Sequence, residues 1–152
     1  MKTSTFFTQE EKDKILSSIR EAEKETSGEI RLHIDSTCKE DVLDRAAWMF
    51  KKLGMEKTAE RNGVLFYLAL NDRKFAIIGD AGINSKVPEG FWDCVKELLA
   101  RNFSQGKFSE GLSEGILLAG KQLKTHFPCA KEDKNELSDD ISFGKGEDRN
   151  DG

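Results

Sequence analysis

The feature that most constrains this chain is the segment 63–70, which is apolar throughout. A strand of this composition buries both of its faces, so it belongs in the middle of a sheet. The turn residues Asn71, Asp72 and Arg73 follow it, and residues 74–79 are again mainly apolar. Two apolar runs joined by so short a polar link predict a β-hairpin. The chain therefore needs other elements to cover a central strand on both sides.

Helices are predicted where apolar residues recur three and four positions apart. A capping box that begins at Thr8 starts the first helix, Asp41 is placed to cap the second, and Pro88 suits the first turn of the third. Between the first two helices, residues 29–35 alternate between apolar and polar, which predicts a half-buried strand. The predicted helices occupy residues 8–27, 42–55, 88–105 and 109–127.

The order of these elements, α-β-α-β-β-α-α, predicts the α/β class. A strand, a crossover helix and a second strand imply a parallel pair with a right-handed connection. The hairpin then adds an antiparallel third strand. We therefore expect a small mixed β-sheet sandwiched between helices.

Charge separates the chain into two parts. From Lys131 onward there are eight carboxylates and four basic residues, which accounts for the whole formal charge of −4. Little apolar material follows Pro128, so we expect a domain over residues 6–128 and an acidic disordered tail over 129–152. The body is balanced in charge, and this argues against a nucleic-acid binder.

The sequence gives no sign of a membrane segment or of a signal peptide, because no apolar run approaches ~20 residues. We therefore expect a cytoplasmic protein. The three cysteines share no metal-ligand spacing. Nucleophile elbow, P-loop and paired-cysteine zinc motifs are also missing from the sequence.

Several fragments in order and spacing resemble the TPM domain family, which is named for a thylakoid-lumen protein, a photosystem II repair protein and a modulator of worm acetylcholine receptors. The resemblance covers residues 6–128 and is carried by Thr26-Ser27-Gly28-Glu29-Ile30-Arg31, Leu53-Gly54-Met55, Arg61-Asn62-Gly63-Val64-Leu65, Ile78-Gly79-Asp80, Gly82-Ile83-Asn84 and Phe91-Trp92. It implies a compact sheet between helices. It also implies weak acid phosphatase activity in some members, and calcium or other divalent-ion binding in some. Many members carry a signal peptide and a membrane helix, neither of which is expected in this sequence.

Topology predicts a candidate site at one end of the sheet. Glu29 and Asn62 begin the two parallel strands, and Asp80 ends the returning third strand at that same end. Glu29 and Asp80 are therefore the expected ligands of a divalent cation, calcium or magnesium, because hard cations prefer oxygen donors. Arg61 and Asn62 are the expected supporting or anion-binding groups. The alternative is an ordinary Arg61–Asp80 ion pair with Asn62 bonding a turn.

Polar residues at the opposite end of the sheet receive a simpler interpretation. Asp35, Ser36, Asn71 and Asp72 are expected to supply strand-end and turn polarity. His33 falls on the polar side of its strand, so a solvated role is expected for it.

Two functions of different kinds follow. The first is a calcium-binding accessory or interaction protein, monomeric, with an unknown protein partner and no nucleic acid. The alternative is a weak metal-assisted phosphatase acting on phosphomonoesters, in which Arg61 neutralises phosphate charge.

Overall fold

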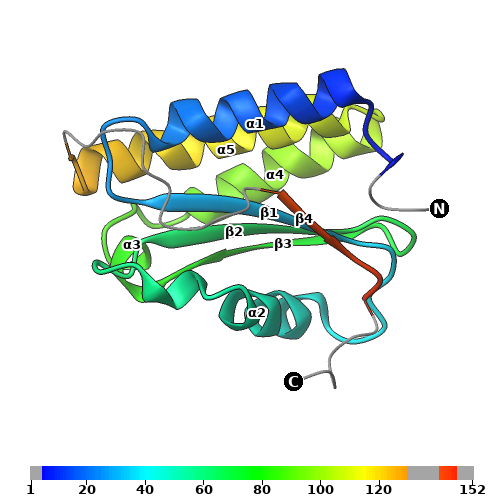
Figure 1. Ribbon diagram of the computed structural model, residues 1–152, viewed down its shortest axis with the longest axis horizontal. Coiled ribbons are helices and arrows are strands. Elements are labelled where there is room, and N and C mark those ends of the chain that lie inside the picture. The colour runs from blue at the N-terminus through cyan, green and yellow to red at the C-terminus, as the bar shows by residue number, and fades with distance from the viewer. Residues whose placement is uncertain (1–4, 130–140, 147–152) are drawn as a thin grey trace.

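The computed structural model describes residues 5–129 and 141–146 of the chain (Figure 1). Helices and strands alternate in the first half, and two long helices precede the last strand. The elements are α1 (Gln9–Glu23), β1 (Glu29–Asp35), α2 (Val42–Lys52), the 3-10 helix η2 (Met55–Lys57), β2 (Gly63–Ala69), β3 (Lys74–Gly79), α3 (Ala81–Asn84), α4 (Phe91–Ser104), α5 (Phe108–His126) and β4 (Ile141–Gly144).

The sheet has the strand order β3-β2-β1-β4. β1 and β2 are parallel, with Glu29 opposite Gly63, and β3 returns antiparallel to β2. All seven residues of β2 are buried, as the apolar run predicts for a central strand. The expected mixed sheet between helices is thus confirmed, including the parallel crossover and the hairpin.

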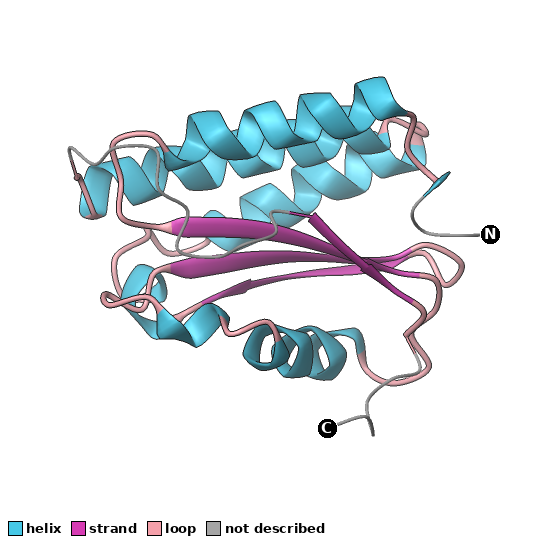
Figure 2. Cartoon of the chain, viewed as in Figure 1, coloured by secondary structure: helices cyan, strands magenta, loops and turns pink. Residues whose placement is uncertain are grey.

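Helices cover the two faces of the sheet unequally. α1, α4 and α5 lie over one face, and α2 lies over the other (Figures 1 and 2). The first face carries the larger core, to which each of these helices contributes fully buried apolar side chains such as Ile19, Leu99 and Ile116. Burial of each such side chain contributes roughly 1.5–3 kcal/mol to stability.

The helix ends follow the sequence signals. Thr8 forms the predicted capping box with Glu11, and the Asp41 carboxylate accepts from the backbone N–H groups of Leu43 and Asp44. Gly54 follows α2 with a left-handed φ of 73°, a conformation that glycine adopts without steric cost. The third long helix begins at Phe91 rather than at Pro88. A short helix, α3, occupies part of the loop expected after Asp80.

The prediction of a disordered tail is wrong for residues 141–144, which form strand β4 and pair in parallel with β1. Ile141 lies opposite Leu32 and extends a sheet edge that otherwise offers open backbone hydrogen-bonding groups. Four residues are too few to reveal a period-two pattern, and the surrounding acidic composition conceals it. Residues 130–140 and 147–152 of the predicted tail lie outside the described part of the chain.

The prediction that β1 is half-buried is also wrong. All seven of its residues are buried, because β4 flanks its edge and its polar face is enclosed. The solvated role expected for His33 is therefore wrong as well, since its exposure is only 4%.

Candidate functional site

The four predicted site residues lie at the same end of the sheet, and Arg61 and Asp80 are in direct contact there. Glu29 lies opposite Gly63 in the register of β1 and β2. The Asp80 N–H donates to the Gly63 carbonyl over 3.0 Å, which fixes the end of β3 beside the start of β2. The topology-based convergence of Glu29, Asn62 and Asp80 is therefore present in the fold.

Asp80 is held by Arg61 in a two-point ion pair. Arg61 Nε donates to Asp80 Oδ2 over 2.7 Å, and Arg61 Nη2 donates to Asp80 Oδ1 over 2.8 Å. Asp80 Oδ1 also accepts from the Ala81 N–H over 2.7 Å and so caps α3. The hydrogen bond and charge of Asp80 raise the pKa of Arg61. Both oxygens of Asp80 therefore already have cationic or N–H donors, which is the arrangement expected from the ion-pair alternative.

The Arg61 backbone is specialised for this position. Its φ of 54° lies in the left-handed region, which is uncommon for a residue with a side chain. Its carbonyl accepts from the Gly82 N–H over 2.8 Å, and a Cβ on Gly82 would lie 2.1 Å from the Glu60 carbonyl oxygen. Gly82 is thus required for close approach of two loops. The Arg61 side chain itself remains 54% exposed.

Asn62 is fully buried between the starts of β1 and β2. Its N–H donates to Thr58 Oγ1 over 3.1 Å, and its side-chain Nδ2 donates to Ser27 Oγ over 3.0 Å. Asn62 Oδ1 has no hydrogen-bond partner among the described residues. An unsatisfied buried acceptor costs about 1–3 kcal/mol, so this oxygen is a place where a donor or a cation would be stabilising.

Glu29 is 1% exposed and is not a free carboxylate. Because β2 separates β1 from β3, the backbones of Glu29 and Asp80 lie two strand spacings apart, roughly 10 Å. Among the residues that the structure describes, no group of three His, Cys, Asp or Glu side chains could hold a metal ion together. The oxygens at this end of the sheet are the carboxylates of Glu29 and Asp80 and the amide oxygen of Asn62, and those of Asp80 are bound by Arg61.

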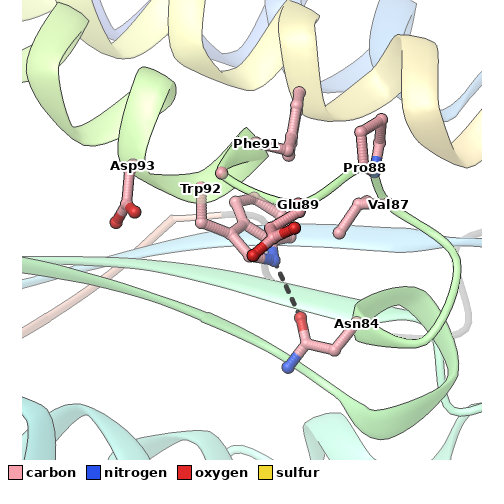
Figure 3. A pocket seen from close by; sticks show the side chains of 8 residues that line it. Asn84, Val87, Pro88, Glu89, Phe91, Trp92 and Asp93 are labelled. Carbon is pink, nitrogen blue, oxygen red and sulfur yellow. Dashed lines mark hydrogen bonds between the residues drawn. The ribbon is translucent and has the colours of Figure 1, made fainter.

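A shallow hollow of about 300 Å³ adjoins this end of the sheet (Figure 3). Its wall is fixed by Asn84, whose Nδ2 donates to the Gly79 carbonyl over 2.7 Å and whose Oδ1 accepts from Trp92 Nε1 over 2.8 Å. Trp92 thereby links the start of α4 to α3. Glu89 and Asp93 place two carboxylates at the rim (Figure 3).

A second polar cluster, missed by the sequence analysis, lies at the opposite end of β1. The fully buried carboxylate of Asp35 accepts from Arg45 Nε over 3.0 Å and from the Tyr67 hydroxyl over 2.6 Å. His33 Nε2 forms a hydrogen bond with its other oxygen over 2.8 Å, and His33 Nδ1 forms one with the Ser142 hydroxyl over 2.7 Å. This network joins β1, α2, β2 and β4.

The charge state of the network follows from its geometry. Burial by itself raises the pKa of Asp35, but hydrogen bonds from His33, Tyr67 and Arg45, with the charge of His33, outweigh burial and lower it. Burial, together with the hydrogen bond to Asp35 and its charge, raises the pKa of Tyr67 well above its ordinary value. Asp35 is therefore an ionised group that Arg45 balances within the fold.

One sequence signal could have revealed this cluster. Arg45 occupies a position in the apolar stripe of α2, one residue before Ala46 and four before Met49. A charged residue at such a position is buried against the sheet and requires an acidic partner there. The polar face of β1 offers that partner in Asp35. Of the other turn residues, Asp72 accepts from the Cys38 N–H over 2.6 Å, as strand-end polarity predicts.

The family is shown by sequence. The sequence model of the TPM domain matches residues 1–122, so the chain belongs to the TPM domain family. No curated protein was found to match the chain.

Solved structures show the same fold. The chain is similar to the BA42 protein of the psychrophilic bacterium Bizionia argentinensis, with 47% identity over 91% of this chain and 96% of that one, and a TM-score of 0.83. The fold is shared with the N-terminal domain of a P. gingivalis protein at 18% identity, covering 87% and 85% of the two chains, with a TM-score of 0.68. It is also shared with the N-terminal domain of cg2496 from Corynebacterium glutamicum at 12% identity, covering 90% and 84%, with a TM-score of 0.64. None of the helices in residues 5–129 and 141–146 is long and apolar enough to cross a membrane.

Proposed function

We propose that this TPM domain is an accessory domain that binds a divalent cation, calcium first, at the end of the sheet formed by Glu29, Asn62 and Asp80. The observation that carries the proposal is Asn62 Oδ1, a fully buried oxygen without a hydrogen-bond donor among the described residues. Calcium takes oxygen ligands from carboxylates, side-chain amides and backbone carbonyls. At this end of the sheet Asn62 Oδ1 would accept the cation directly, and the carboxylates of Glu29 and Asp80 would exchange their present partners for it.

In this proposal Arg61 competes with the cation for the Asp80 carboxylate. Its guanidinium neutralises Asp80, yet its side chain is 54% exposed, so it has open solvent beside it into which it would move. A divalent charge beside Asp80 favours that movement, since it replaces the guanidinium and repels it. In this proposal Arg61 then becomes available to a carboxylate of a protein partner. Cation binding and partner binding would be coupled through one side chain.

The test is a calcium titration of the full chain followed by amide chemical shifts and thermal unfolding. We expect millimolar calcium to shift Gly28, Asn62 and Asp80 and to raise Tm, because binding to the folded state stabilises by ~1.4 kcal/mol at ten times Kd. Asp80→Asn is expected to abolish both effects. Arg61→Gln is expected to tighten binding, because the competing cation is removed.

Asp93→Asn is the matched control, since it removes an exposed carboxylate near the same end of the sheet. It is expected to leave the calcium response unchanged. Shifts confined to residues after Lys131 would instead mean that the acidic segment attracts counterions, and the site would then be an ion pair alone.

A phosphatase remains the second candidate, favoured by the half-exposed guanidinium of Arg61 and by the name TPM phosphatase that the family's sequence model bears. The same variants separate the two functions. In a phosphatase Arg61 would be needed for phosphate binding, whereas in the accessory domain Arg61 competes with calcium for Asp80. We expect slow turnover of a generic phosphomonoester at most. Metal-dependent turnover in the range of ~1–1000 per second, lost in both Arg61→Gln and Asp80→Asn, would overturn the accessory function.

A further inference from the structure

A second hollow, independent of the proposed cation site, lies at the other end of the sheet. It has a volume of about 640 Å³ and opens between the β2–β3 hairpin and the connection from α4 to α5. Pockets for small organic ligands span about 300–1,000 Å³, so it is large enough for such a molecule. No residue proposed for the cation site lines it.

Four phenylalanines that are only half-buried form its wall. Phe6 meets Phe108 with ring centroids 5.4 Å apart, Phe108 meets Phe103 at 5.0 Å, and Phe103 meets Phe75 at 5.3 Å. The rings thus form a continuous aromatic row that draws on the N-terminal segment, β3, α4 and α5. These rings pack against the larger core on one side and border the hollow on the other, so they give it the apolar lining typical of small-molecule sites.

Among the residues that the structure describes, Arg73 is the single charged one that lines the hollow. It lies in the hairpin turn with a left-handed φ of 52°, and its backbone N–H donates to the Leu70 carbonyl over 3.3 Å. No carboxylate among the described residues pairs with its guanidinium. The pocket thus combines an apolar interior with one uncompensated cation at its rim.

The geometry points to this pocket as a binding site for an apolar carboxylic acid of medium chain length. The hydrocarbon chain would lie along the phenylalanine row, where burial of each CH₂ contributes ≈ 0.8 kcal/mol. The carboxylate would meet Arg73, whose planar guanidinium matches a carboxylate with two hydrogen bonds. A cationic or sugar-like ligand fits neither the lining nor the charge.

The test compares decanoate with decanol and acetate, each below its micellar or solubility limit, by amide and methyl shifts of the full chain. Decanoate is expected to shift Leu68, Leu70 and Phe103, decanol to bind more weakly, and acetate to produce no shift there. Arg73→Gln is expected to weaken decanoate roughly two- to fivefold, the range of an exposed ion pair, and to leave decanol unchanged. Ala100→Trp, which fills the pocket from α4, is expected to abolish both.

Arg101→Gln is the matched control, because Arg101 is exposed on the same helix and does not line the pocket. It is expected to leave both affinities unchanged. If Arg101→Gln and Arg73→Gln weakened decanoate binding equally, the effect would come from net charge, and the proposed contact between Arg73 and the carboxylate would be wrong. Equal affinity of decanoate and decanol for the unmodified chain, or binding of neither, overturns the proposal. A folded Ala100→Trp variant that still binds decanoate also overturns it.

Discussion

Asp35 is an ionised carboxylate with 0% exposure, and three side chains from three elements compensate for its loss of water. A buried ion pair of this kind need not add stability over an apolar pair of the same shape. Removal of one charge of the pair is costly, however, because the other charge then stays buried without the opposite charge that balanced it. The network therefore has a small effect on the stability of the native protein and a large effect on the stability of variants that lack one of its members.

Asp35→Asn is expected to lower the free energy of unfolding by about 3–5 kcal/mol, because the guanidinium of Arg45 loses its buried counter-charge. Because the folded pKa of Asp35 is depressed, its contribution is present above the unfolded value of about 3.9 and is lost as pH falls through the folded value. Urea unfolding between pH 3 and 7 measures both. Asp72→Asn is the control, and an Asp35→Asn variant with unchanged acid sensitivity would contradict the assignment.

The roles of single residues could be predicted from the sequence where a short local pattern forms only one kind of structure. Thr8 and Asp41 could be predicted as caps because capping depends on neighbours within three residues. The predicted topology placed Arg61 and Asp80 at the same end of the sheet. Whether a metal ion or a guanidinium neutralises Asp80 depends on side-chain geometry, which the spacing of residues in the sequence does not specify. Asp35 was misjudged because its partners Arg45 and Tyr67 lie on two other elements, distant from it in the sequence.

Among the elements, α1 and α5 pack more closely than ordinary side chains allow. A Cβ on Gly120 would lie 2.5 Å from the Ala22 Cβ and 2.7 Å from the Ala22 Cα. Backbone atoms cannot give way as a flexible side chain can, so this glycine sets the distance between the two helices. The pair covers the larger core, and its spacing affects every residue beneath it.

Gly120→Ala is expected to destabilise the domain even though alanine favours helix by about 1 kcal/mol, because overpacking typically costs about 1–3 kcal/mol. Gly115→Ala on the same helix is the matched control. A Cβ there meets only side-chain atoms, the nearest at 3.3 Å, so a near-neutral effect is expected. Thermal unfolding of the two variants decides, and a Gly120→Ala variant as stable as Gly115→Ala would contradict this account.

In the whole molecule the predictable part is the pairing of neighbouring elements. The long apolar strand β2, its hairpin with β3 and the crossover through α2 follow from periodicity and from handedness rules. Strand β4 could not be predicted in this way, because its partner β1 precedes it by about a hundred residues and its own four residues carry no period. The candidate site and the aromatic pocket lie at opposite ends of the sheet that these pairings produce.

The pairing of β4 with β1 has a consequence for self-association. Without β4, the full length of β1 would present unpaired N–H and C=O groups along one side, and such a side recruits strands from other copies of a chain. A chain ending at Asp140 is therefore expected to form larger species as its concentration rises, in size-exclusion chromatography with light scattering. A chain ending at Gly146, which keeps β4, should elute as the full chain does, and identical behaviour of both truncations would contradict a protective role. Strand β4 would thus prevent edge-to-edge association between copies of the domain.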